Sequence, residues 1–218
     1  MMINVESARR QMVEQQIRAW EVLDPRVLVT MTDVRRELFV PEAYRDLAFA
    51  DTAIPLGFGE HMLPPKVDGR ILQALELAPQ DEVLEIGTGS GFLAACLARL
   101  ADRVHSLEIH PEFAHRAVEN LRLAACNNVQ VEVRDGMTLV DESVWDAVAV
   151  TGSLPVYDER FQRALRIGGR LFVVAGQAPV MEAWKVTRVG EREWTRTSLF
   201  ETVIDPLVNA PRPPAFVF

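Results

Sequence analysis

The residues best suited to chemistry form a short glycine-rich turn. Gly87, Gly89 and Gly91 alternate directly after the apolar run 83–86. Glycines at alternate positions tolerate positive backbone dihedrals and carry no Cβ atom, so a ligand can lie against the main chain. Such a turn between a strand and a helix is typical of nucleotide-cofactor sites. The sequence therefore predicts a cofactor pocket here.

Glu85 narrows the choice of cofactor. Dinucleotide-binding turns usually read G-x-G-x-x-G, with the third glycine one residue later and a helix N-terminus facing a pyrophosphate. In this chain the third glycine comes early, and Glu85 stands at the strand end just before the turn. An acid there would repel a pyrophosphate and attract a cation. S-adenosylmethionine has a sulfonium and an ammonium group and no phosphate, so the turn favours this cofactor.

Two further acids follow later strands. Glu108 ends the run 103–107, about twenty residues after the turn, which is the spacing at which an acid reaches a ribose. Asp135 follows the run 129–133 and can accept a hydrogen bond from an adenine amino group. Each acid alone is compatible with an ordinary solvated strand end, whereas three in this order favour S-adenosylmethionine. The residues expected to bind it are Glu85, Gly87, Thr88, Gly89, Gly91, Glu108, Ile109, Asp135, Gly136 and Thr151.

The pattern around these residues alternates between strands and helices. Strands are expected at 83–86, 103–107, 129–133, 145–150 and 170–174, and helices at 91–100, 111–124 and near 157–166. A βαβ series implies a parallel sheet with right-handed crossovers. The β-prone runs 182–189 and 195–204 predict an antiparallel hairpin at its edge. The expected fold is therefore α/β, a three-layer Rossmann-like class I methyltransferase fold with a mostly parallel seven-stranded sheet.

The N-terminal third precedes this fold. An amphipathic helix is expected over 6–21, and Asp24-Pro25 caps and opens a second one. The glycine- and proline-rich stretch 57–65 predicts an irregular loop that acts as a lid or site wall. We therefore divide the chain into residues 1–66, the N-terminal helices and active-site loop packed on the main domain, and residues 67–218, the cofactor-binding domain.

Composition limits the class of protein. The 218 residues are 49% hydrophobic and carry a formal net charge of -8, which suits an ordinary globular chain and argues against nucleic acid as a partner. No apolar stretch approaches the ~20 residues of a membrane span, so we expect a cytoplasmic protein without membrane contact. Cys96 and Cys126 lack the spacing of metal ligands, and no metal is expected.

From about residue 12 to about residue 207, the chain resembles the protein-L-isoaspartate O-methyltransferase family. The residues that carry the resemblance are Met12-Val13, Gln16-Ile17, Arg26-Val27-Leu28, Arg36-Glu37-Leu38-Phe39-Val40-Pro41, Tyr44, Gly57-Phe58-Gly59, the glycine turn, Asp135-Gly136, Trp145-Asp146-Ala147-Val148, Gly168-Gly169-Arg170-Leu171 and Pro206-Leu207. The resemblance implies a repair enzyme that uses S-adenosylmethionine to methylate the α-carboxylate of isoaspartyl residues in damaged proteins. It also implies a protein or peptide as substrate.

The loop after the paired glycines of 57–59 is one of two segments that depart from the family pattern, and the other is the strand after Gly168-Gly169, where Val174 replaces the family's usual Pro. After the paired glycines, family members usually carry Gln or a small polar residue, then Thr, Ile and a catalytic Ser, whereas this chain has Glu60, His61, Met62 and Leu63. Leu63 thus stands where the resemblance puts the serine, and it lacks the hydroxyl thought to orient the acceptor carboxylate. His61 is the candidate donor or base in its place, unless it is an exposed loop residue with no role.

Three functions stay open on the sequence. The first is methyl transfer to isoaspartyl carboxylates, and the second is transfer to another acceptor, such as a small molecule, a peptide or RNA. The third is cofactor binding without transferase activity. Leu63 favours the second and third, whereas the cofactor residues favour the first two. Four more residues lie on segments expected at the rim of the site, where the methyl acceptor would bind. They are Lys66, Thr151, Ser153 and Tyr157. The oligomeric state is left open.

Overall fold

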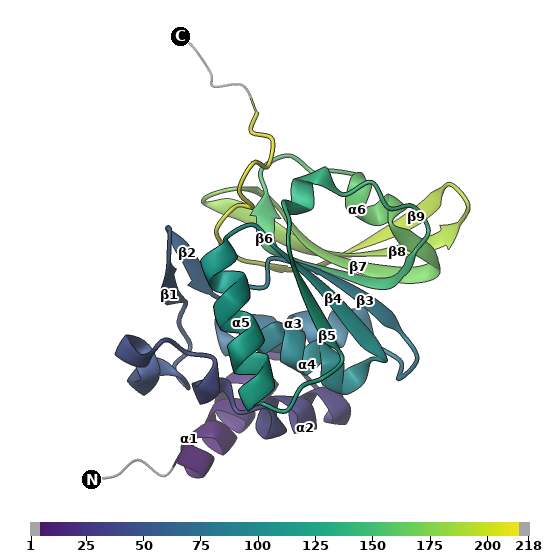
Figure 1. Ribbon diagram of the computed structural model, residues 1–218. Coiled ribbons are helices and arrows are strands. Elements are labelled where there is room, and N and C mark those ends of the chain that lie inside the picture. The colour runs from purple at the N-terminus through teal and green to yellow at the C-terminus, as the bar shows by residue number, and fades with distance from the viewer. Residues whose placement is uncertain (1–4, 214–218) are drawn as a thin grey trace.

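A seven-stranded sheet forms the centre of the protein (Figure 1). The computed structural model describes residues 5–213. In spatial order the strands are β5 (Val129–Val133), β4 (Arg103–Glu108), β3 (Glu82–Ile86), β6 (Trp145–Leu154), β7 (Leu165–Gln177), β8 (Val180–Gly190) and β9 (Glu193–Glu201). The first five are parallel, and β8 and β9 add an antiparallel hairpin at one edge. The predicted fold class is confirmed.

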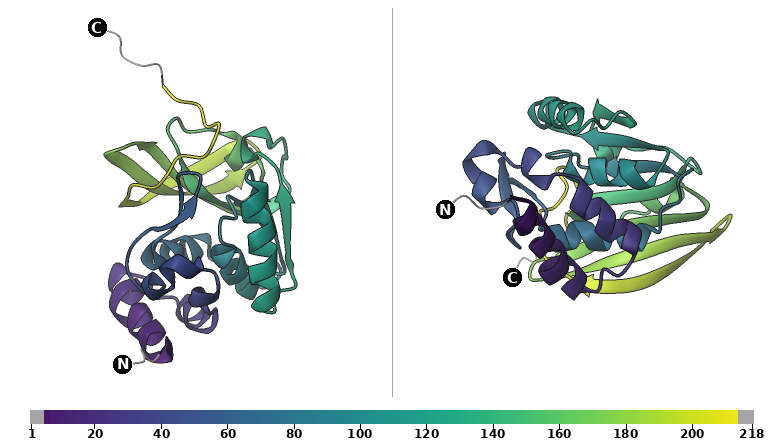
Figure 2. Two further views of the ribbon diagram at one scale, coloured as in Figure 1. Left: turned by 60° about the vertical axis from the view of Figure 1, so that its left-hand side comes forward. Right: turned by 90° about the horizontal axis from the view of Figure 1, so that it is seen from below.

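Helices cover the two faces of this sheet unequally. One face carries α3 (Pro65–Leu75), α4 (Phe92–Leu100) and α5 (Pro111–Leu123), while the other carries the single turn α6 (Arg160–Arg163). The N-terminal helices α1 (Val5–Met12) and α2 (Pro25–Asp33) lie outside the first of these helical layers (Figure 2). The 3-10 turns Arg36–Leu38 and Glu42–Leu47 then lead into the pocket region. The chain therefore has three main layers and an additional N-terminal layer on one side.

Two expected helices differ in the structure. The helix expected over 6–21 is α1 followed by a π-helical turn, Val13–Ile17, and a 3-10 turn, Arg18–Trp20. The helix expected near 157–166 is shortened to α6, because the chain already enters β7 at Leu165, earlier than the strand expected from 170. Aromatic side chains fill part of the space on that face instead. They are Trp145, Tyr157, Trp184 and Trp194, packed against the apolar cluster around Phe161.

The segment expected as an irregular loop contains a small antiparallel hairpin, so that expectation was wrong. Strands β1 (Ile54–Gly57) and β2 (Glu60–Met62) pair around Phe58 and Gly59, whose φ angles of 54° and 87° form a tight two-residue turn. The paired residues Ile54 and Met62 are buried, at 0% and 5% exposure. This burial explains how a glycine-rich stretch becomes an ordered strand pair.

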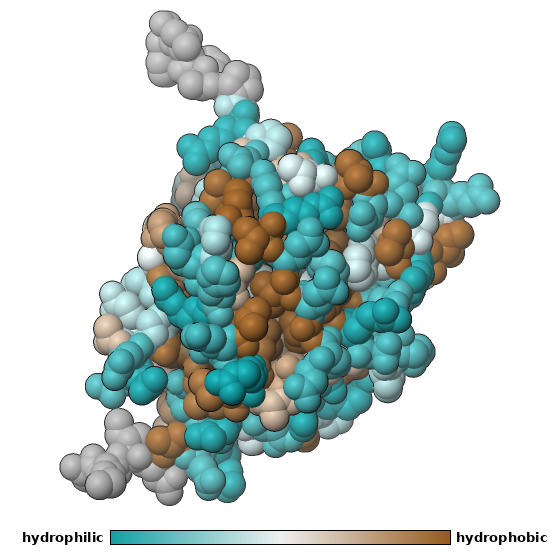
Figure 3. Space-filling model, viewed as in Figure 1, coloured by the Kyte–Doolittle hydropathy of each residue, from teal (hydrophilic) through white to brown (hydrophobic). Residues whose placement is uncertain are grey.

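The core has two parts, one on each face of the sheet. Val83 of β3 packs into the cluster that includes α3, α4 and the N-terminal helices, whereas Leu84 packs into the cluster on the α6 face. Residues from the N-terminal helices and from the sheet thus share one apolar core. At the outer edge, β5 is only partly buried and Val133 is 51% exposed. Figure 3 shows hydrophobic residues reaching the surface in the middle of the side of the molecule that is also seen in Figure 1.

None of the helices within residues 5–213 is both long enough and apolar enough to cross a membrane.

Candidate active site

A cavity of about 320 Å³ opens at the carboxyl ends of β3, β4 and β6. This is the edge at which parallel α/β sheets bind ligands. The hairpin β1–β2 and the segment after β9 supply two further walls, and Figures 1 and 2 show the two side by side. All the expected cofactor residues except Gly91 line the cavity, together with His61 and Leu63.

The glycine turn brings the main chain into close contact with β6. Gly87 has φ +95°, and a Cβ atom there would collide with Oγ1 of Thr151. The Thr151 hydroxyl donates to the carbonyls of Ile86 and Gly87, both at 2.9 Å. Gly91 has φ +85° and caps α4, which starts at the next residue. A glycine is therefore needed for this contact between the turn and Thr151.

Glu85 is a fully buried carboxyl group with half of its hydrogen-bonding capacity unused. Its side chain is 0% exposed, and its Oε2 accepts a hydrogen bond from the Ser106 hydroxyl, while no partner among the described residues reaches Oε1. Burial raises the pKa of Glu85 to about 8, with smaller contributions from the negative charges of Asp68 and Glu108. A cationic group in the cavity would supply both the missing bond and the missing charge.

The two later acids are held by backbone amides. Oε2 of Glu108 accepts from the amide of Gly89 at 2.8 Å, and Oε1 accepts from the amide of His110 at 3.0 Å. Asp135 likewise accepts from the amide of Met137 at 2.8 Å. Each carboxylate oxygen keeps a lone pair after these bonds. Both acids are thus held in position while able to accept from ligand hydroxyl or amino groups.

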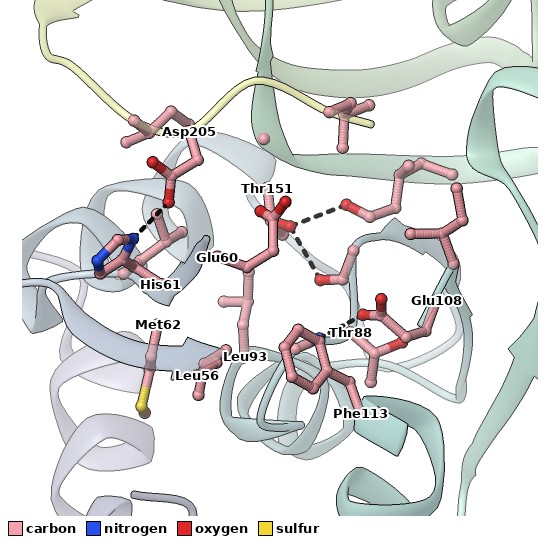
Figure 4. A pocket seen from close by; sticks show the side chains of 18 of the residues that line it. Leu56, Glu60, His61, Met62, Thr88, Leu93, Glu108, Phe113, Thr151 and Asp205 are labelled. Carbon is pink, nitrogen blue, oxygen red and sulfur yellow. Dashed lines mark hydrogen bonds and ion pairs between the residues drawn. The ribbon is translucent and has the colours of Figure 1, made fainter. Parts of the chain in front are cut away.

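Residues 60–63 form another wall of the cavity. Leu63 lines the cavity, and its carbonyl accepts from Arg36 Nη2 at 2.6 Å. His61 is exposed and pairs through Nδ1 with Oδ2 of Asp205 at 2.8 Å (Figure 4). Asp205 comes from the segment after β9, so this wall joins two distant parts of the chain.

Of the further rim candidates, only Thr151 lines the cavity. Lys66 pairs with Asp51 at 2.7 Å, and the hydroxyl of Ser153 donates to the carbonyl of Ile204 at 3.1 Å. Tyr157 packs with the cluster on the α6 face. The structure therefore separates these three from the cavity.

Sequence reasoning singled out Glu60 only as a departure from the family pattern. Its side chain lines the cavity, and Figure 4 shows it pointing inward from β2. Burial raises the pKa of Glu60, and the negative charges of Asp205 and Glu108 raise it further against the opposing effect of His110 and His61. The available signal was an acid at a position where the resemblance leads one to expect Gln or a small polar residue. The sequence carried no signal for Asp205, because this residue lies far from the hairpin along the chain.

The described residues hold no cluster of three or more His, Cys, Asp or Glu side chains suited to a metal ion.

The family model for Protein-L-isoaspartate(D-aspartate) O-methyltransferase (PCMT) matches residues 7–210. Among curated relatives, a protein-L-isoaspartate O-methyltransferase 1 of Syntrophobacter fumaroxidans is 40% identical over 182 residues, covering 83% of this chain and 85% of its own. A protein-L-isoaspartate O-methyltransferase 2 of Pelobacter propionicus is 35% identical over 209 residues, covering 95% and 93%.

The fold is also found in solved structures. A Plasmodium falciparum protein described as a beta-aspartate methyltransferase, in complex with S-adenosyl-L-homocysteine, superposes with a TM-score of 0.78. It shares 18% sequence identity, and the match covers 91% of this chain and 97% of the other. At this identity the likeness concerns the fold alone.

Proposed function

The chain belongs to the protein-L-isoaspartate O-methyltransferase family, and from this premise we propose that it is an S-adenosylmethionine-dependent O-methyltransferase whose acceptor is the carboxylate of an isoaspartyl residue. The acceptor would be presented by a damaged protein or peptide. The family model matches residues 7–210, a range that includes the glycine turn, the acids at the strand ends and the β1–β2 hairpin.

The unpaired Oε1 of Glu85 is the observation that carries the cofactor proposal. A buried polar atom without a partner is costly, and it marks a position where a ligand group completes the bond. The ammonium end of S-adenosylmethionine supplies such a donor with a positive charge, whereas a pyrophosphate supplies neither. Glu85 thus serves as the acid that holds the cationic end of the cofactor.

The other predicted residues serve the rest of the cofactor. Glu108 accepts from the ribose hydroxyls, and Asp135 accepts from the adenine amino group. At the turn around Gly87, Gly89 and Gly91 the cofactor can lie against the main chain. The rest of the cofactor wall is formed by Thr88, Ile109, Gly136 and Thr151. When bound, S-adenosylmethionine supplies an electrophilic methyl group on its sulfonium sulfur. A carboxylate acceptor is already anionic, so the protein's task is positioning rather than proton abstraction.

The acceptor approaches between the hairpin and the segment after β9. In this proposal the boundary expected at residue 66 separates a cover on the acceptor side, residues 5–66, from the cofactor-binding domain, residues 67–213; residues 1–4 and 214–218 of the expected domains lie outside the described residues. Leu63 stands where the family carries its serine and gives that part of the wall an apolar surface. His61 then acts through its pair with Asp205, which holds the two walls together.

Transfer of a labelled methyl group tests this function. The full chain is incubated with methyl-labelled S-adenosylmethionine and either an isoaspartyl peptide or the same peptide with ordinary aspartate. We expect label in the isoaspartyl peptide alone, and we expect base to release it, because a methyl ester is base-labile. Cofactor binding without transfer to either peptide would contradict the proposal and leave a cofactor-binding protein or another acceptor. Base-stable label would indicate an acceptor other than a carboxylate.

A further inference from the structure

The carboxyl group of Glu60 points into the cavity and has no hydrogen-bond partner there. It lies on β2, lines the same space as Glu85 and Glu108, and points inward in Figure 4. Among residues 5–213, no donor is paired with it. By contrast, the other acids of the cavity wall each accept a hydrogen bond, namely Asp68, Glu85, Glu108, Asp135 and Asp205. Glu60 is thus the acid of this wall of which neither carboxyl oxygen has a partner among the described residues, whereas each of the others has at least one oxygen engaged.

The surroundings of Glu60 raise the pKa of its carboxyl group. Asp205 on one side and Glu108 on another face it with negative charge, and half-burial removes part of its hydration. The histidines His61 and His110 lower the pKa of Glu60. Their combined effect is smaller than that of burial and the two acids, since the net result is a raised pKa. A second carboxylate brought close raises it further, since two neighbouring carboxyl groups share one proton. With an anionic carboxylate beside it, Glu60 can take up a proton and donate a hydrogen bond to that anion.

On the hairpin side of the cavity, few other side chains can donate. Leu63 and Met62 are apolar, and the Thr151 hydroxyl is bonded to two backbone carbonyls. Nδ1 of His61 is used by Asp205. Nε2 of His110 is unpaired, but that ring stacks on Phe58 with centroids 4.7 Å apart. His110 also follows Glu108 closely, at the part of the wall proposed for the cofactor.

We propose that the carboxylic acid of Glu60 donates a hydrogen bond to the acceptor carboxylate and orients it for methylation. This inference rests on the proposed function. One acceptor oxygen accepts a hydrogen bond from the Glu60 hydroxyl, while the other forms the new bond to the methyl carbon as the bond from that carbon to sulfur breaks. Transfer of a methyl group to a carboxylate releases no proton, so Glu60 keeps its proton throughout. The contact replaces the one that the family's serine would make at the place of Leu63.

The test compares Glu60→Gln, Glu60→Ala and Glu60→Ala/Leu63→Ser in the full chain. Gln keeps an N–H donor but does not titrate, so its kcat/KM for an isoaspartyl peptide should stay within about threefold of wild type. The alkaline decline of the wild-type profile should disappear in this variant. Glu60→Ala should lose about tenfold to a hundredfold in kcat/KM, the loss expected for one unpaired polar contact. The double variant should recover most of it, because the introduced hydroxyl restores a donor. Glu142→Gln, at an exposed acid outside the cavity, is the matched control.

Proton uptake gives a readout that does not depend on turnover. The isoaspartyl peptide is titrated calorimetrically into protein loaded with S-adenosyl-L-homocysteine, in two buffers of different ionisation enthalpy. Wild type should take up a substantial fraction of a proton above neutral pH, and Glu60→Gln should take up none. Equal uptake by both proteins would contradict the proposed contact.

Three other outcomes are decisive. Loss of activity in Glu60→Gln at every pH would mean that Glu60 removes a proton from a neutral acceptor, and it would refute the inference. A loss confined to affinity for S-adenosylmethionine would do the same, since Glu60 would then serve the cofactor. Proton uptake on peptide binding without any methyl transfer would refute the proposed function while supporting the contact.

Discussion

Nδ1 of His61 lies 2.8 Å from Oδ2 of Asp205, although 144 positions separate the two residues in the chain. The pair joins the β1–β2 hairpin to the segment after β9, which are two walls of the same cavity. Both side chains are exposed, at 38% and 39%, so the pair adds little to global stability. Its effect should be local, on how firmly the cavity mouth is held.

Removal of this pair should therefore affect substrate binding more than the stability of the fold. In His61→Ala and in Asp205→Ala we expect the free energy of unfolding to change by less than about 1 kcal/mol. The KM for the isoaspartyl peptide should rise several-fold in both variants, because the walls lose their connection. Urea denaturation and steady-state kinetics measure the two effects. A hundredfold loss of kcat in His61→Ala with unchanged KM would instead identify the imidazole as a base.

The affinity for S-adenosylmethionine should depend on pH through Glu85. Its pKa is raised to about 8 by burial and by the negative charges of Asp68 and Glu108. Below this pH the carboxyl group must release its proton before it pairs with a cation, so affinity should rise with pH and level off above about 8. Calorimetry across pH 6 to 9 measures this.

Glu85→Gln should remove that pH dependence and weaken binding about tenfold to a hundredfold, which is the effect of losing one charge-assisted hydrogen bond. The fold should persist, because the Gln oxygen still accepts from Ser106. Glu82→Gln, at the opposite end of β3, serves as the control and should leave the affinity unchanged. Binding by Glu85→Gln that equals wild type would rule out this role for Glu85.

A buried ion pair holds the backbone behind Leu63. Arg36 is 0% exposed and its Nη1 lies 2.7 Å from Oδ2 of Asp68, while its other nitrogens donate to the carbonyls of Ala48 and Leu63. Arg36→Met should lower the free energy of unfolding by about 3–5 kcal/mol, because Asp68 is left buried without its partner. Arg36→Met/Asp68→Leu should regain part of this in urea denaturation.

The pH dependence of these variants provides the check. Burial already raises the pKa of Asp68 to about 7 in spite of Arg36. Without Arg36 the carboxyl group should be neutral over a wider range, so the single variant should lose less stability at pH 5 than at pH 8. A double variant as unstable as the single one would show that the unpaired charge is not the cause.

Gly87→Ala should be more damaging than Gly168→Ala, although both glycines have positive φ angles, +95° and +85°. A Cβ at Gly87 meets Thr151 Oγ1, whereas no described residue other than the chain neighbours of Gly168 lies within 4 Å of a Cβ there. We expect about 1 kcal/mol of backbone strain at Gly168, and about 2–4 kcal/mol at Gly87, where the Thr151 hydroxyl must also move. Thermal unfolding and S-adenosylmethionine titration compare the two. Equal losses would contradict the importance of the contact with Thr151.

The sequence determined the elements whose signals are local. The apolar strand before Gly87, the alternation of strands and helices, and the cap Asp24-Pro25 depend on residues within a few positions, and Asp24 does accept from the amide of Arg26 at 2.8 Å. Parallel topology then follows from chain connectivity. For the same reason the strand-end acids Glu85, Glu108 and Asp135 could be assigned to one edge of the sheet, since the carboxyl ends of parallel strands meet there.

The tertiary structure decided what depends on packing between distant segments. Residues 54–62 form a hairpin because Ile54 and Met62 find a common core, which the glycines and prolines of that stretch concealed. His61 meets Asp205 only because the segment after β9 returns across the cavity. The groups that act on the pKa of Glu60 likewise come from three separate parts of the chain. Sequence signals act over a few residues, whereas burial and charge at this cavity are set by side chains that only folding brings together.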